Sequence, residues 1–395
     1  MWAELLPVGR SAATGGYRRH AWNSADAECR AWFEQQARSR GLAHRTDRNG
    51  NQWAWHGDPA AGNAVVTGSH LDSVPDGGAY DGPLGVISAF AAYDELRARG
   101  AEFTRPLAIV NFGDEEGARF GVACVGSRLA TGVLDREAAH ALRDADGVRL
   151  PDAMERAGHD PALIGPDPEL LGRIGAFVEL HVEQGRFLTE GQPIGVASAI
   201  WPHGRWRFDF HGEANHAGTT LLADRRDPML TYATTVLAAR KKARLAGALA
   251  TFGKVAVEPN GTNAIASLVR GWLDSRAPDE QALGRLVAGI EQSAVERGER
   301  DGVRVELTRE SYTPVVDFDG PLRDRLAHLL DAPVLPTGAG HDAGILASAV
   351  PTAMLFVRNP SGVSHSPAEH AERADCHAGV TALARVLEDL ACRPS

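Results

Sequence analysis

The most informative segment of this chain is Gly68-Ser69-His70-Leu71-Asp72, followed nine residues later by Asp81-Gly82. The apolar run Ala64-Val65-Val66-Thr67 directly precedes them and predicts a buried β-strand. An imidazole and two carboxylates at the end of a buried strand are costly unless a cation neutralises them. The stretch therefore predicts an α/β sheet whose strand ends hold a metal site.

Three more polar clusters follow apolar runs further along the chain. They are Asp114-Glu115-Glu116, His181-Val182-Glu183-Gln184 and Ser364-His365-Ser366. In an open α/β sheet, ligands gather outside the carboxyl ends of the strands. A single histidine after a strand is more often structural, but four such strand ends together indicate a two-metal hydrolase.

The composition is that of a soluble globular protein, with 395 residues, 44% hydrophobic and 23% charged. This length favours two domains. The net charge of −10 argues against a nucleic acid or a membrane surface as partner. The first residues do not form a signal peptide, and the four cysteines show no CxxC spacing. We therefore expect a reduced, cytoplasmic protein without a disulfide framework.

Residues 60–205 alternate between strand-like and helix-like runs, which predicts a mostly parallel sheet covered by helices. The expected elements are strands at Ala64–Gly68, Leu107–Phe112 and Ala176–Leu180, a helix at Leu84–Arg99, and near the end of the chain a strand at Thr352–Val357 and a helix from about Glu369 to Leu390.

The region between these two parts has a different order of elements. A strand is expected at Trp206–His211, followed by a helix opened by Asp227-Pro228. The elements expected after that helix are strands near Thr251–Val257 and Ala264–Ser275, a helix from Pro278 to Arg297 and a strand at Val303–Arg309. The order β-α-β-β-α-β is that of a ferredoxin-like α+β domain. We expect this inserted lid or dimerisation domain at 205–314, and one catalytic domain made of 1–204 and 315–395.

Three imidazoles and two carboxylates suit a borderline divalent ion such as zinc or manganese. Asp81 lies on the loop that enters the helix beginning near Leu84. It is the natural bridge between two ions, which such a carboxylate holds about 3.5–4 Å apart. Asp72, two residues after His70, is placed to fix the tautomer of that histidine.

These residues identify a family. The chain resembles the hydantoinase/carbamoylase amidases, within the larger aminoacylase and carboxypeptidase superfamily of two-metal hydrolases. The matching motifs, in family order, are GSHLDSVPDGGAYDG (68–82), GDEEGARF (113–120), ELHVEQG (179–185), GEANHAGTT (212–220), GAGHDA (338–343) and SHSPAE (364–369). In this superfamily the histidine of the HVEQG motif marks the carbamoylase branch, whereas related peptidases tend to have an acidic residue there.

The resemblance implies the roles of the site residues. One metal ion would be held by His70, Asp81 and His181, and a second by Asp81, Glu116 and His365. Zinc would be the ion in each of the two positions, with manganese, cobalt or nickel as alternatives. Glu115, beside a ligand, would be the general base, and His216 would stabilise the oxyanion.

The resemblance also implies a homodimer that forms through the inserted domain, with His216 reaching the active site of the partner. Asn263 and Arg276 would contact a small substrate that bears a carboxylate, which an arginine can bind through two hydrogen bonds. Gln184 would contact the substrate head group. His341, in a glycine-rich loop, would be a further substrate contact.

Arg358, in the lead-in to His365, is a departure from many relatives. As a lone residue it is more often a surface arginine. The sharper hypothesis is a second contact to an anionic group, which would favour an acidic substrate such as N-formylglutamate.

We therefore expect an amidohydrolase that cleaves a linear amide or ureido bond of an N-carbamoyl-L-amino acid or of an allantoate-like ureido acid. The alternative is a deformylase of an acidic N-formyl-L-amino acid. A dipeptidase or aminoacylase is disfavoured by His181 in the HVEQG motif. A catalytically silent scaffold is disfavoured because Glu115 and all five expected ligands are present.

Overall fold

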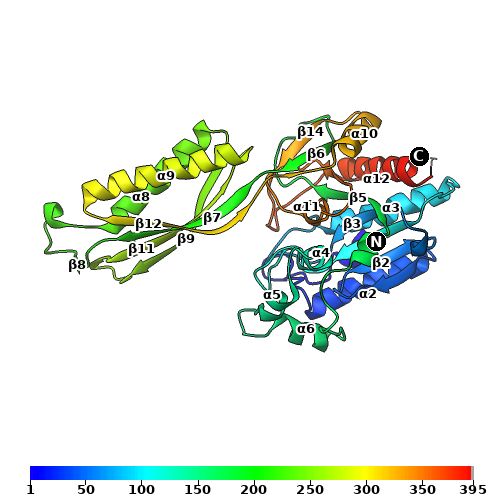
Figure 1. Ribbon diagram of the computed structural model, residues 1–395, viewed down its shortest axis with the longest axis horizontal. Helices are drawn as coiled ribbons and strands as arrows, with labels where there is room; N and C mark the ends of the chain where they lie inside the picture. The colour runs from blue at the N-terminus through cyan, green and yellow to red at the C-terminus, as the bar shows by residue number, and fades with distance from the viewer. Residues whose placement is uncertain (393–395) are drawn as a thin grey trace. The chain divides into compact units, whose positions relative to one another are not determined.

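The computed structural model describes residues 1–392 of the chain. Two compact units are present (Figure 1). The first is built from Met1–Ala199 and the residues from Asp317 onward, and the second from Ile200–Val316. The predicted insertion, 205–314, falls inside the second unit.

The first unit is organised around a nine-stranded sheet with the strand order β1-β2-β4-β3-β5-β15-β6-β13, and with β14 beside β6. The neighbours β4, β3, β5 and β15 run parallel, whereas the pairs β1–β2, β2–β4 and β15–β6 are antiparallel. The predicted α/β fold with a mostly parallel central sheet is therefore confirmed. The strands are β1 (Ala43–Thr46), β2 (Gln52–His56), β3 (Ala64–His70), β4 (Leu107–Phe112), β5 (Ile174–Val182), β6 (Ile194–Ile200), β13 (Val316–Asp317), β14 (Val334–Thr337) and β15 (Thr352–Val357).

Apolar runs explain the centre of this sheet. Every residue of β3, β4 and β15 is buried, as is usual for parallel strands covered on both faces. The main core joins these strands to α2 (Ser24–Ser39), α3 (Pro83–Ala98) and α12 (Arg373–Leu387). The remaining helices of this unit are α1 (Trp2–Leu5), α4 (Val125–Thr131), α5 (Arg136–Ala141), α6 (Leu150–Arg156), α7 (Pro168–Leu171), α10 (Gly320–Leu330) and α11 (Asp342–Leu346), with 3₁₀ turn η1 (Pro59–Ala61) and π-helical η3 (Glu388–Cys392).

The second unit contains a four-stranded antiparallel sheet with the order β12-β7-β11-β9. Trp206, Phe208 and Phe210 alternate along β7 and lie in the core shared with the two long helices. The order β7-α8-β9-β11-α9-β12 is the predicted ferredoxin-like pattern. The elements are β7 (His203–His211), β8 (Asn215–His216), η2 (Leu222–Asp224), α8 (Pro228–Leu245), β9 (Leu249–Glu258), β10 (Ala264–Ile265), β11 (Leu268–Arg276), α9 (Glu280–Asp301) and β12 (Arg304–Thr313).

The structure corrects two predicted boundaries. The strand expected at Ala264–Ser275 is split, because β10 pairs with β8 whereas β11 belongs to the main sheet of the unit. The last helix, expected from about Glu369, begins only at Arg373. Glu369 instead lies in the loop after β15, where its carboxylate accepts backbone N–H groups of another loop.

None of the helices in residues 1–392 has the length and apolar character needed to cross a membrane.

Candidate metal centre

Two neighbouring parallel strands, β3 and β5, end in buried histidines. His70 is the last residue of β3, and its Nδ1 atom lies 3.2 Å from the Asp72 carbonyl oxygen. The Nδ1 atom of His181 on β5 lies 2.8 Å from the Val182 carbonyl oxygen. A carbonyl oxygen can only accept a hydrogen bond, so Nδ1 of each ring carries the proton. The Nε2 atom of each ring is then free of a proton and can bind a metal ion.

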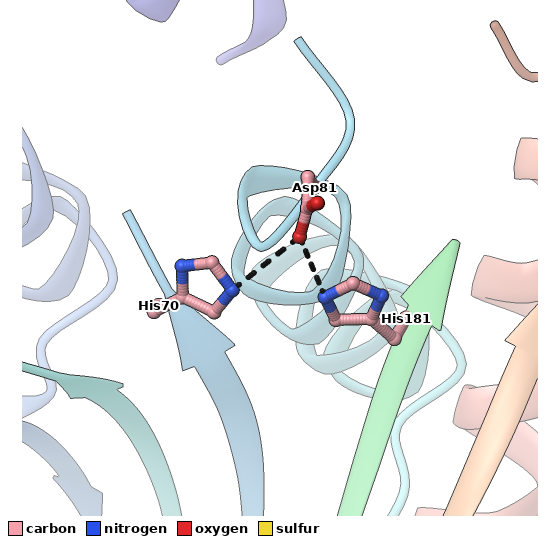
Figure 2. Close-up of side chains that lie close together, drawn as sticks. All are labelled: His70, Asp81 and His181. Carbon is pink, nitrogen blue, oxygen red and sulfur yellow. Dashed lines mark ion pairs between the residues drawn. The ribbon is translucent and has the colours of Figure 1, made fainter. Parts of the chain in front are cut away.

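Asp81 faces both of these Nε2 atoms from the start of α3 (Figure 2). Its Oδ1 atom lies 3.6 Å from Nε2 of His70 and 3.1 Å from Nε2 of His181. The next residue, Gly82, has φ +80°, and a Cβ atom there would lie 2.4 Å from Cε1 of His70. A glycine is therefore required at the turn that brings Asp81 to the two rings.

A second group of ligands gathers on the other oxygen of Asp81. Nε2 of His365 lies 3.5 Å from Oδ2 of Asp81 and 3.6 Å from Oε2 of Glu116. The Glu116 side chain is almost buried, whereas that of His365 is 52% exposed and its backbone has φ +54°. The groups His70–Asp81–His181 and Asp81–Glu116–His365 each bring three ligand atoms within 4.8 Å of one another.

The chemistry of these donors fits divalent cations. The buried Nε2 atom of His181 lacks a well-aligned hydrogen-bond partner, although a carboxylate oxygen lies beside it. Such an atom is costly in a protein interior unless something else binds it. Imidazole nitrogens together with carboxylate oxygens form the kind of ligand set that zinc and related ions accept.

The pKa values reflect the crowding of acidic groups. Burial, reinforced by the charge of Asp81, raises the pKa of Glu116 to about 8. Burial also raises the pKa of Glu115 well above its usual value, with only partial compensation from His70. For Asp81 burial acts in the same direction, but the contacts with His181 and His70 lower its pKa well below the usual range. A bound cation would relieve the repulsion among these carboxylates.

Glu115 lies next to the ligands without belonging to either group. Its Oε2 atom is 3.6 Å from Nε2 of His70, and its Oε1 atom accepts a hydrogen bond from the thiol of Cys124 (3.4 Å). Asp72, which follows the end of β3, holds the backbone that carries Glu115 and Glu116. Its carboxylate accepts the backbone N–H groups of Glu115 (3.2 Å) and Glu116 (3.0 Å). An oxygen of the same carboxylate lies 3.4 Å from Nδ1 of His70.

Comparison with known proteins identifies the family. The family model of Peptidase family M20/M25/M40 matches residues 66–389. The chain belongs to this family. It is 35% identical to an N-carbamoyl-L-amino acid amidohydrolase of Geobacillus stearothermophilus, over 99% of this chain and 98% of that protein. It is 32% identical to an allantoate amidohydrolase of Escherichia coli (strain K12), over 95% of this chain and 93% of that protein.

Solved structures of hydantoinase/carbamoylase family amidases have the same fold as this chain. A crystal structure of a hydantoinase/carbamoylase family amidase from Burkholderia ambifaria superposes with a TM-score of 0.89 at 30% identity, and covers 100% of this chain and 96% of that one. The resemblance found in the sequence motifs is thereby confirmed. This M20-family member is a hydrolase of linear amides.

Two of the residues predicted to contact substrate lie at the ligand groups of this hydrolase. Nε2 of Gln184 donates to Oδ2 of Asp81 (2.8 Å) and lies 3.3 Å from Nε2 of His365. His341 is buried with its ring centroid 4.5 Å from that of His181. Burial and the neighbouring His181 lower the pKa of His341 well below the usual value, so its imidazole is neutral at physiological pH.

Arg358 is paired within the protein. Its Nε atom donates to Oδ2 of Asp375 on α12 over 2.8 Å, and both side chains are largely buried. This carboxylate already neutralises the guanidinium, so the geometry lends no support to the predicted contact with a substrate anion.

The three predicted residues of the second unit fall into two groups. His216 is exposed on β8, paired with Ala264 of β10, and Asn263 accepts the backbone N–H of Ala217 through its carbonyl oxygen (3.0 Å). Arg276 is the last residue of β11, where it contacts Asp274. The strand β11 separates the two groups by eight residue steps (268 to 276), about 26 Å at roughly 3.3 Å per residue.

Two buried glutamates near the site were not predicted from the sequence. Glu369 accepts the backbone N–H groups of Tyr80 and Asp81. Glu179 accepts hydrogen bonds from Ser69 Oγ (2.7 Å) and from the backbone N–H of Ala343 (2.9 Å). Glu369 stands inside the SHSPAE motif and Glu179 opens the ELHVEQG motif, but only three-dimensional contacts show which groups they bind.

Proposed function

We propose that this hydrolase uses two divalent ions per subunit to cleave a linear C–N bond of an N-carbamoyl-L-amino acid or of an allantoate-like ureido acid. One observation carries the proposal: Asp81 presents Oδ1 to His70 and His181, and Oδ2 to His365. A carboxylate shared between two ligand groups is the bridge that a two-metal hydrolase needs.

The first ion would be held by His70, Asp81 and His181, and the second by Asp81, Glu116 and His365. Zinc fits this mixture of imidazoles and carboxylates best, and manganese, cobalt or nickel are the alternatives. Bound there, the ions would supply Lewis acidity, which polarises the scissile carbonyl group and makes water in the site easier to deprotonate.

Glu115 is the proposed proton carrier. Its carboxylate is buried beside the first ligand group but is not part of it, so one of its oxygens is available to accept a proton from water. The pKa raised by burial makes Glu115 a stronger base, and an adjacent cation would lower that pKa again. A value near neutrality suits both the uptake and the release of a proton.

The proposed reaction begins with the attack of water on the substrate carbonyl group. Water gives one proton to Glu115 while its oxygen forms a bond to the carbonyl carbon of the substrate. The C–N bond breaks, and the proton held by Glu115 passes to the departing nitrogen. His216 is proposed to donate to the developing oxyanion. Gly218 donates its backbone N–H to Nδ1 of His216 (3.0 Å), which leaves Nε2 as the donor of the neutral ring.

A homodimer is part of the proposal. A small substrate cannot contact both His216 and Arg276 of the same inserted unit, because the length of β11 separates them. If both contact substrate, a second copy must supply one of them. The exposed Leu230, Leu237 and Leu245 on α8 support an interface on this unit. Asn263 would act together with His216, and Arg276 would bind the substrate carboxylate.

Gln184 and His341 are the proposed contacts of the catalytic unit to the substrate head group. In the deformylase alternative, Arg358 is the reason to expect an acidic side chain on the substrate, and the ion pair with Asp375 removes that reason. The described cysteines are all unpaired, which supports a reducing compartment such as the cytoplasm as the proposed location.

A substrate panel tests the proposed activity. The purified protein is stripped with a chelator, reconstituted with zinc, manganese or cobalt, and assayed on N-carbamoyl-L-amino acids, allantoate, N-formyl-L-glutamate and dipeptides. The proposal expects the highest kcat/KM on a carbamoyl or ureido substrate. A preference for dipeptides or for N-formyl-L-glutamate would contradict it.

A further inference from the structure

The loop between β15 and α12 carries His365, and it has no regular secondary structure. Asn359 organises its first half: its Oδ1 accepts the backbone N–H groups of Ser361 (3.1 Å) and Gly362 (2.9 Å), and its Nδ2 donates to the carbonyl oxygen of Val363 (2.8 Å). These bonds end just before His365. The placement of the histidine therefore depends on contacts made by the second half of the loop.

Glu369 makes those contacts. Its Oε1 atom accepts the backbone N–H groups of Tyr80 (2.9 Å) and Asp81 (3.0 Å). The hydroxyl of Ser364 lies 3.3 Å from Oε2 of Glu369 and 3.3 Å from Oδ2 of Asp81, so it can donate to either carboxylate. Its own backbone N–H donates to the carbonyl oxygen of Ser366 (3.0 Å). The two serines flank His365, so Glu369 connects the turn of His365 to the loop of Asp81. The Glu369 side chain is buried, so water does not compete for these bonds.

The loop of Asp81 is shaped to receive this side chain. A Cβ atom on Gly78 would lie 2.4 Å from Oε1 and 2.5 Å from Cβ of Glu369. Both distances are far shorter than any van der Waals contact. Only a glycine at position 78 therefore lets the Glu369 carboxylate approach the backbone of Tyr80 and Asp81.

We propose that Glu369 is a positioning residue that builds the second ligand group, Asp81–Glu116–His365, by holding the His365 loop against the Asp81 loop. This inference rests on the proposed function. The first ligand group depends much less on Glu369, because two of its three ligands, His70 and His181, lie on paired strands, whereas His365 lies on the loop that Glu369 holds. Glu369 therefore controls the affinity for the second ion more than that for the first.

Metal titration of four variants tests this assignment. Zinc or manganese in a buffered concentration series is added to metal-stripped protein, and the bound ions per subunit are counted by mass spectrometry of the metal. In Glu369→Ala the second ion should bind about 10- to 100-fold more weakly, the usual loss for a residue that orients a ligand, with the first ion little changed. Glu369→Gln should retain near wild-type binding, because its amide can keep all three bonds with Ser364 acting as acceptor.

Gly78→Ala should reproduce the loss of Glu369→Ala, since it displaces the same carboxylate. Glu372→Ala is the matched control, an exposed glutamate on the same loop whose partner is the exposed His370, and it should bind both ions as the wild type does. Equal affinity for the second ion in Glu369→Ala and wild type, or a parallel loss of both ions, would overturn the assignment. A wild-type protein that never binds two ions would instead refute the proposed function itself.

Discussion

Oε2 of Glu115 lies 3.6 Å from Nε2 of His70, so the proposed base is adjacent to a proposed ligand while belonging to neither ligand group. A change at Glu115 should therefore affect proton transfer without removing a metal ligand. Glu115→Gln should therefore bind two ions as the wild type does, yet lose about 10²- to 10⁴-fold in kcat, the usual contribution of a general acid–base group. Steady-state kinetics and a metal count on the same sample check this, with Glu372→Gln as the control. Turnover near that of the wild type would rule out Glu115 as the proton carrier.

Asp72 offers a test of how the ligands are oriented. Its carboxylate holds the backbone of Glu115 and Glu116 and lies beside Nδ1 of His70. Asp72→Ala should weaken metal binding by about 10- to 100-fold, because such supporting residues fix the orientation of the ligands. A competition titration with a metal-binding dye measures the loss. Unchanged affinity would show that the ligands hold their positions without Asp72.

Gly82 tests the turn that presents Asp81. Gly82→Ala introduces a Cβ atom into the His70 ring at φ +80°, so both stability and metal binding should fall. The backbone strain alone is of the order of 1–3 kcal/mol. Gly100→Ala is the matched control, since Gly100 has φ +72° but a Cβ atom added there would meet no other atom within 4 Å. It should lower the melting temperature and leave metal binding intact, and equal metal loss in both variants would contradict this account.

The pH dependence of stability tests the acidic cluster. In metal-stripped protein Glu116 has a pKa of about 8, against 4.5 in an unfolded chain, so the folded state binds more protons between these values. Its contribution to stability is therefore lost as the pH rises. Buried histidines with a lowered pKa, such as His341, oppose this only below about pH 6.5.

Thermal melts from pH 6.5 to 8 measure this effect. The melting temperature of metal-stripped protein should fall across this range, while added zinc should remove most of the decline by stabilising the ionised carboxylates. A flat profile without metal would mean that the cluster does not retain its protons.

Subunit mixing tests the proposed role of His216 across a dimer interface. His216→Ala and Glu115→Gln should each be nearly inactive as pure proteins. In a mixed dimer one site keeps its own Glu115 and receives His216 from the partner, so random pairing should restore about a quarter of the wild-type activity. No recovery, with subunit exchange verified by native mass spectrometry, would exclude a role for His216 in the partner's active site.

Much of the site could be predicted because its residues follow apolar runs. His70 and His181 lie at the ends of buried strands and Glu116 lies four residues after one, and the structure brings all three to one edge of the sheet. Parallel strands with buried faces are readable from composition alone. By contrast β1 was not predicted, since its sequence Ala43–Thr46 is mostly exposed and carries no apolar alternation.

Residues whose partners are distant in the chain could not be assigned from the sequence. The ion pair of Arg358 with Asp375 joins residues 17 positions apart, and no sequence pattern indicates that these two side chains meet. The sequence predicts Glu369 at the start of a helix, but its carboxylate binds backbone N–H groups almost 290 residues earlier in the chain. Every residue except proline has a backbone N–H donor, so the sequence does not show which of these donors a distant carboxylate binds.

Anomalous diffraction from crystals grown with zinc or manganese would locate the ions bound at Asp81. We expect two anomalous peaks about 3.5–4 Å apart on either side of Asp81, one beside His70 and His181 and the other beside Glu116 and His365. A single peak, or peaks away from Asp81, would contradict this expectation.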